Sequence, residues 1–236
     1  MTPIQQLMLG VGASKKTYMD DLFSTYLWTG NATARSINNG INLSGEGGMT
    51  WIKNRTSSMS HQLLDTERGV TKILESQNNS AEQTDANGLT AFNNNGFTIG
   101  VSGPYNSDTH DISSWTFRKA PGFFDVVTWD GNDTSGRTIS HSLGSVPGCV
   151  IVKCTTHSDS WQVWHRNTGG NQYSLELESS NGRITDTSMW NSTAPTASNF
   201  TLGNNDKVNG SGKSYVAYVF AGGESTAATA RSIDFD

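Results

Sequence analysis

The sequence has few charged residues, and its positive and negative charges nearly balance. Charged residues make up 16% of the 236-residue chain, and the formal net charge is −5. No block of like charges is present, so the basic surface on which nucleic-acid binding depends is missing. The chain has no run of about 18 apolar residues, and its N-terminus lacks the charged, apolar and small-residue succession of a secretory signal. We therefore expect no nucleic-acid partner, no membrane insertion and synthesis in a cytoplasm.

Cysteine is also scarce. The two cysteines, Cys149 and Cys154, lie in the stretch GCVIVKC, which is typical of a strand. At about 3.3 Å per residue their Cα atoms would lie ~16 Å apart on opposite faces, whereas a disulfide needs Cα atoms within about 7 Å. We expect two free thiols, as in a protein that folds in a reducing compartment.

Gly, Asn, Ser and Thr are abundant throughout the chain, and these residues favour turns and strands over helix interiors. The 22 aromatic residues argue against disorder, because a disordered chain would collapse around that much apolar area. The composition therefore predicts an ordered all-β protein.

An internal repeat organises the chain. Five segments recur in the same order at an offset of 100 to 103 residues, which favours a duplication over chance. The alternative is one large sandwich whose halves merely share a β composition. The matching segments are 26–37 with 127–139, 48–53 with 148–153, Gln62 with Gln162, 97–100 with 200–203, and the strand ending at Phe117 with the strand ending at Phe220.

Each copy contains short alternating runs separated by turn residues, at the spacing expected of a sandwich. The run 173–179 (YSLELES) predicts Leu175 and Leu177 on the core face and Glu176 and Glu178 in solvent. The run 149–154 is apolar on both faces, which predicts a central strand covered twice. Residues 60–76 have a weakly helical pattern broken by glycine, and we interpret them as two strands because their counterpart is strand-like.

We predict two tandem antiparallel β-sandwich modules, jelly-roll-like, at residues 20–120 and 121–223. An N-terminal arm covers 1–19, and 224–236 forms a linker or the start of a further module. The arm carries an apolar cluster that is too short and too rich in glycine to fold alone, so it needs a partner. That cluster consists of Ile4, Leu7, Met8, Leu9 and Val11.

Several motifs bear on chemistry, and none of them predicts catalysis. The stretch 131–138 (GNDTSGRT) has the glycine spacing of a phosphate-binding loop, but Arg137 stands where that motif has lysine, so we expect a Gly-Asn hairpin turn. Oxygen-bearing side chains at 130–133 lack the remainder of a calcium loop. The histidines show no metal-ligand spacing. We therefore expect no metal, no cofactor and no enzymatic activity.

Two features are candidates for sugar chemistry. Glu176 and Glu178 would lie about 7 Å apart along a strand, within the range of paired glycosidase carboxylates, although a solvated strand face produces the same pattern. Trp190 lies in a polar stretch, TDTSMWNST, and is our candidate for an exposed ring that contacts a glycan, since other tryptophans fall in strands that form the core.

Four stretches of the sequence resemble fibre and appendage proteins of marine tailed bacteriophages. They are 1–31 (MTPIQQLMLGVGASKKTYMDDLFSTYLWTGN), 40–55 (GINLSGEGGMTWIKNR), 114–132 (SWTFRKAPGFFDVVTWDGN) and 214–223 (SYVAYVFAGG). The resemblance implies a virion protein, assembled in a bacterial cytoplasm, whose arm docks on other virion proteins while β-modules project outward. It also implies a homo-oligomer, commonly a trimer, and a final segment (ARSIDFD) that begins a laminin-G-like or concanavalin-like module.

The expected function is therefore host attachment by a tail fibre or capsid fibre, through a surface glycan or protein receptor. A glycan-binding lectin module of a cellular protein is the alternative. A capsular polysaccharide depolymerase is the third interpretation.

Overall fold

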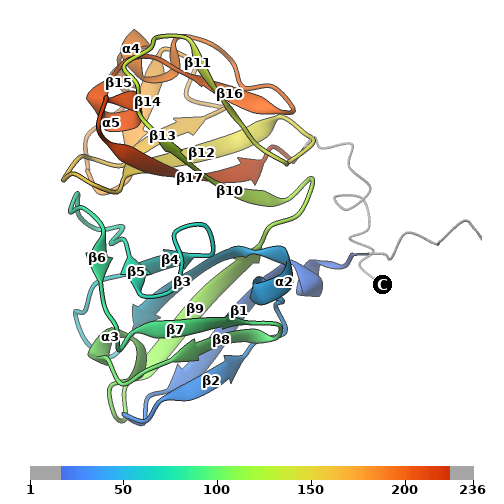
Figure 1. Ribbon diagram of the computed structural model, residues 1–236, viewed down its shortest axis with the longest axis vertical. Coiled ribbons are helices and arrows are strands. Elements are labelled where there is room, and N and C mark those ends of the chain that lie inside the picture. The colour runs from blue at the N-terminus through green and yellow to red at the C-terminus, as the bar shows by residue number, and fades with distance from the viewer. Residues whose placement is uncertain (1–16, 224–236) are drawn as a thin grey trace, which may run out of the picture.

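The computed structural model describes residues 17–223, and within them the protein is all-β, as predicted. We call residues 20–120 module 1 and residues 121–223 module 2. In each module the first strand pairs with the last in the large sheet, whereas the second strand belongs to a separate smaller sheet. Figure 1 shows the modules one above the other.

Module 1 has one large sheet and one smaller sheet packed on its outer face. The large sheet has the order β1 (Phe23–Thr29), β9 (Asp111–Arg118), β3 (Gly48–Asn54) and β4 (Gln62–Asp65). The smaller sheet has the order β2 (Arg35–Asn38), β8 (Gly96–Ile99) and β7 (Leu89–Asn93). The remaining elements are β5 (Lys72–Ile73), β6 (Gln83–Thr84), η1 (Met19–Asp21), α2 (Leu43–Glu46) and α3 (Gly103–Asn106).

Module 2 repeats this arrangement with two added strands at one edge. Its large sheet has the order β10 (Phe124–Asp130), β17 (Ser214–Ala221), β12 (Pro147–Cys154), β13 (Gln162–His165), β14 (Tyr173–Glu176) and β15 (Ile184–Thr185). The outer sheet pairs β11 (Arg137–Ser140) with β16 (Asn199–Leu202), and the short helices are α4 (Thr187–Trp190) and α5 (Asp206–Asn209).

The strand registers of the two modules correspond residue by residue. Trp51 lies opposite Trp115 and Leu63, and its counterpart Ile151 lies opposite Tyr218 and Val163. A duplication predicts this equality of strand order and register, and duplication remains our interpretation of it.

The two large sheets and the two outer sheets stack as layers around three apolar clusters, and β5 and β6 form a separate two-stranded sheet. One cluster fills each module, and the third lies between the large sheets, which face each other across the middle of Figure 1. We call this third cluster the joint. Its buried members are Met49, Leu63, Leu74, Phe124, Val126, Trp161, Val216 and Tyr218.

Strand β12 is covered on both faces, as the sequence pattern predicted. Val150 and Val152 belong to the core of module 2, whereas Ile151 packs against the joint. Both cysteines are free, which confirms that prediction, and Cys154 is buried while Cys149 is half-buried. Residues 60–76 contain β4 and β5, which confirms the two-strand interpretation of that stretch.

Two local expectations are wrong. The pairing of Gln162 with Glu176 places Ser174 on the core face, where Ser174 is fully buried and donates to Gln162 Oε1 at 2.8 Å; Leu177, just beyond the strand end, is 37% exposed. Buried hydrogen bonding, rather than apolar alternation, thus sets the orientation of β14. Residues 131–136 do not form a hairpin turn, because they link β10 to β11, which belong to different sheets.

Candidate functional site

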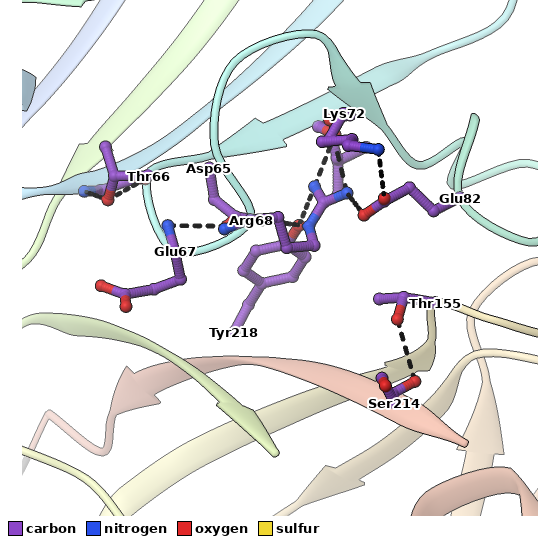
Figure 2. A network of polar contacts seen from close by, with 11 residues as sticks. Asp65, Thr66, Glu67, Arg68, Lys72, Glu82, Thr155, Ser214 and Tyr218 are labelled. Carbon is purple, nitrogen blue, oxygen red and sulfur yellow. Dashed lines mark hydrogen bonds and ion pairs between the residues drawn. The ribbon is translucent and has the colours of Figure 1, made fainter. Parts of the chain in front are cut away.

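A network of buried charges crosses the joint at the turn between β4 and β5. Arg68 donates to Asp65 at 2.7 Å and to Glu82 at 3.1 Å, all within module 1 (Figure 2). Tyr218 of module 2 donates its hydroxyl to Asp65 at 2.9 Å and accepts from Arg68 at 3.2 Å. The network therefore holds a strand of one module against a turn of the other.

Burial sets the protonation states in this network. Burial raises the pKa of Tyr218 well above its ordinary value, so the phenol keeps the proton that it donates to Asp65. Burial alone would lower the pKa of Arg68, but Tyr218 and the carboxylates of Asp65 and Glu82 raise it above its ordinary value. The guanidinium stays charged, and a buried ion pair of this kind needs every partner in place.

A second contact joins the modules beside this network, where Trp161 stacks on Tyr218 with ring centroids 6.3 Å apart. The indole of Trp161 is fully buried, and its N–H donates to the carbonyl oxygens of Glu75 and Asn78 at 3.2 and 3.0 Å. The backbone of Glu82 also donates to the carbonyl of Thr155 at 2.8 Å. The charged network and Trp161 therefore both hold module 2 against module 1.

A groove opens beside this joint, and residues of both modules form its walls. Its volume is about 320 Å³. The module 1 wall carries a large aromatic ring, and the module 2 wall carries an exposed leucine and a carboxylate. The lining residues are Trp51, His61, Ser76, Gln77, Leu177 and Glu178.

The aromatic wall continues along the sheet face of module 1. Trp51 lies opposite Trp115 in the pairing of β3 with β9, with ring centroids 6.4 Å apart at 74°. Thr25 of the edge strand β1 pairs with Trp115, and Leu27 lies two residues further along that strand, so Leu27 projects from the same face as Trp115. Leu27 is 60% exposed. We call Leu27, Trp51, His61 and Trp115 the aromatic shelf.

His61 is held in one tautomer. The indole N–H of Trp51 donates to His61 Nδ1 at 2.9 Å, so the neutral ring carries its proton on Nε2. Burial lowers the pKa of His61, and Lys53 lowers it further, so the neutral form predominates near pH 7. The groove therefore contains an imidazole that donates a hydrogen bond and carries no charge.

The structure places Trp190, the tryptophan that we expected to contact a glycan, inside module 2. Trp190 is 2% exposed and packs in the core of module 2, so the expectation of an exposed ring is wrong. The polar stretch around it forms α4, which turns Trp190 and Met189 inward while Asn191 ends the helix in a left-handed conformation. The polar neighbours of Trp190 in sequence did not indicate that it is exposed, because within one helical turn adjacent residues point to opposite sides, some to solvent and some to the core.

The other predicted site residues divide into two groups. The proposed docking residues of the arm lie outside the described residues 17–223. Glu176 binds Lys207 at 2.8 Å, which lowers its pKa, and Glu178 accepts from the backbone of Trp161 at 3.2 Å. The two carboxylates are therefore engaged with different partners rather than facing each other as an acid and base pair.

Sequence reasoning missed Trp115. Of the seven tryptophans, five donate the indole N–H to a partner and Trp190 is buried, whereas Trp115 is part-exposed with no indole hydrogen bond among residues 17–223. The signal was available, since Trp115 is flanked by small polar residues in SSWT whereas its counterpart Tyr218 lies in the apolar VAYVF.

The structure also bears on metals and membranes. In the described part of the chain, no three or more His, Cys, Asp or Glu side chains gather in a way that would hold a metal ion. No helix between residues 17 and 223 is both long and apolar enough to cross a membrane.

Fold and groove together define an all-β protein of two packed sandwiches with a groove at their junction. The family model for a domain of unknown function (DUF7483) matches residues 19–228, and the chain belongs to this family. Because the match covers both modules, the family is defined by the pair rather than by one sandwich. No curated protein and no solved structure matches the chain.

Proposed function

We propose that the chain is a structural attachment protein of a tailed phage particle, a fibre or appendage that docks through its N-terminal arm and presents the paired sandwiches to the host. The partners are other virion proteins at the arm, further copies of the chain in a homo-oligomer such as a trimer, and a host surface receptor. The four stretches that resemble marine phage appendages support this proposal.

The observation that carries the proposal is the joint. An appendage that meets a cell surface has to transmit load without its domains moving apart, and a shared apolar cluster flanked by a buried ion network resists such motion. Domains that merely follow one another on a linker move relative to one another by default.

The groove favours a second candidate, a glycan-binding lectin module of a cellular protein. A part-exposed tryptophan beside hydrogen-bonding side chains suits sugar recognition in either setting. Particle incorporation separates the two, because a cellular lectin has no reason to be part of a virion. A depolymerase, the third interpretation, would release reducing ends from host polysaccharide, and we expect no such release.

The test is incorporation into particles. We expect purified virions to contain the full chain in stoichiometric amount by mass spectrometry, and a chain lacking residues 1–19 to be absent from them. Deletion of residues 224–236 provides a matched terminal control and should leave incorporation unchanged. Thermal unfolding of each purified chain shows whether the sandwiches remain folded.

A folded chain without residues 1–19 that still enters particles would remove the docking role of the arm. Absence of the full chain from virions would overturn the proposed function itself.

A further inference from the structure

We propose that the groove between the modules, together with the aromatic shelf, binds a neutral oligosaccharide, with the ring of Trp115 stacking on a sugar. This names the ligand class of the proposed attachment function and rests on that function for its biological role. The contacts that would bind the sugar do not depend on whether the chain is part of a particle.

The shape of the shelf suits pyranose rings. Trp51 meets Trp115 edge to face at 74°, and Trp51 meets His61 in the same manner at 73°, so the rings form steps rather than a flat plate. The apolar C–H face of a sugar packs on an aromatic face, while its hydroxyls extend sideways to polar groups. Leu27, at the free edge of the sheet, extends the apolar surface by one residue.

The polar groups of the groove suit hydroxyls. His61 offers an Nε2–H donor, while one carboxylate oxygen of Glu178 accepts from Trp161 and leaves further acceptor capacity at the other. Ser76 and Gln77 add a hydroxyl and an amide at the same wall. A hydroxyl both donates and accepts, so a wall that mixes donors and acceptors matches it better than a purely apolar surface would.

The charges of the groove select against acidic sugars. Glu178 lines the groove, and Glu75 is linked to it through the amide of Gln77. The lysines at equivalent positions of the two facing sheets are already engaged, since Lys53 donates its ammonium to the carbonyl oxygens of Asn54 and Ser57, and Lys153 donates to those of Cys154 and His157. A carboxylated or sulfated sugar would meet like charge without a free cation to pair with, so the ligand is uncharged.

The site exists because the two modules are not equivalent at the joint. The counterpart of Trp115 in module 2 is Tyr218, which is buried under the β4–β5 turn, and the counterpart of Trp51 is the aliphatic Ile151. Only the module 1 sheet therefore presents part-exposed indoles, and the second wall of the groove comes from Leu177 and Glu178 beyond β14. Neither module carries the site alone.

The occupant is a sugar rather than a protein segment. A docked helix or strand would need a continuous apolar strip, but on this face Leu27 pairs across the sheet with Ser113, and Trp115 pairs with Thr25. Polar residues thus interrupt the apolar surface between Leu27 and Trp115.

The experiment is affinity electrophoresis of the full chain through gels cast with neutral polymers (dextran, laminarin, galactomannan, xylan) or acidic ones (alginate, carrageenan), followed by titration of the retained polymer. We expect retention by at least one neutral polymer and not by the acidic ones. Trp115→Ala should weaken binding at least tenfold, and Trp115→Phe should recover part of the loss. Leu27→Arg, at a 60% exposed position, should weaken it severalfold without affecting folding.

The matched control is Tyr173→Ala, which removes a part-exposed ring that packs on Arg183 at the start of β14, the end away from Leu177, and should leave binding unchanged. Retention by no neutral polymer, retention by acidic polymers alone, or wild-type binding by both Leu27→Arg and folded Trp115→Ala would overturn the inference. A chain that binds neutral glycan yet is absent from virions would refute the proposed function and leave this inference standing.

Discussion

Two buried asparagines perform the same task in the two modules. Each side chain accepts a hydrogen bond from the loop that follows the first strand, and donates to one carbonyl in that loop and another near the end of the outer sheet. The bonds of Asn106 join it to Asn31, Thr33 and Gly100, and those of Asn209 join it to Asn132, Thr134 and Gly203. The GN motif of the repeat is therefore structural, because its backbone N–H is already bonded to an asparagine.

We predict that Asn209→Ala destabilises the protein by about 2 kcal/mol or more, because each buried backbone group left without a partner costs about 1–3 kcal/mol. Asn209 is fully buried, so water does not replace the lost bonds. Chemical denaturation measures the change. Asn204→Ala, at an exposed position five residues earlier, serves as the control and should change stability by less than ~0.5 kcal/mol. Equal stability of the two variants would show that the amide is dispensable.

For single residues, the sequence predicts the environment of a side chain only where the residues next to it in sequence determine that environment. Free thiols at Cys149 and Cys154 followed from the geometry of one strand, which is local. The burial of Trp190 depends on how α4 packs on the core of module 2, and the exposure of Trp115 depends on how far module 2 covers the sheet of module 1; both are tertiary facts. Trp190, which was chosen because its sequence neighbours are polar, is instead a core residue of the short helix α4.

Among the elements, the turn between β4 and β5 has the largest role, since it joins the modules through one guanidinium. Arg68 is 4% exposed in its side chain and Asp65 is fully buried. Besides its carboxylate partners, Arg68 donates to the carbonyl of Leu63 at 3.0 Å. Its pattern in sequence, DTERG, looks like an ordinary polar turn, so nothing local distinguishes it from a solvated loop. Only the approach of β17 from module 2 makes it a buried site.

We predict that Arg68→Met lowers the free energy of unfolding by about 3–5 kcal/mol, because it leaves the Asp65 carboxylate buried without its cation. Lys72→Met removes the same charge from a side chain that is 41% exposed and 3.5 Å from Glu82, so it should cost less than about 1 kcal/mol. Urea titrations of both variants provide the comparison. The double variant Asp65→Asn with Arg68→Met should be less destabilised than the two single losses added together. Additive losses would mean that the two groups do not interact.

For the whole molecule, the sequence predicted two sandwiches of the right strands but treated them as independent modules. The repeat shows which segments correspond, and that is enough to predict that the two copies share one strand order, but not what that order is. It does not predict the joint, because counterparts there are a mixture: Phe117 and Phe220 are identical, whereas Trp51 corresponds to Ile151. The apolar pattern on both faces of β12 was the one sequence signal that a further layer packs on the large sheet of module 2.

The last prediction is that the two modules unfold together. Separating them would expose Phe124, Trp161 and Tyr218, all fully or almost fully buried, and would break the ion network at Arg68. At about 0.7 kcal/mol per residue near 60 °C, cooperative unfolding of about 200 residues has a van't Hoff enthalpy of roughly 140 kcal/mol, against about 70 for one module alone. Calorimetry distinguishes these values.

Leu89→Ala in the module 1 core and Leu202→Ala in the module 2 core should each shift the same single transition, since each removes a fully buried leucine. Two transitions, each moved by only one of these variants, would show that the joint does not couple the modules.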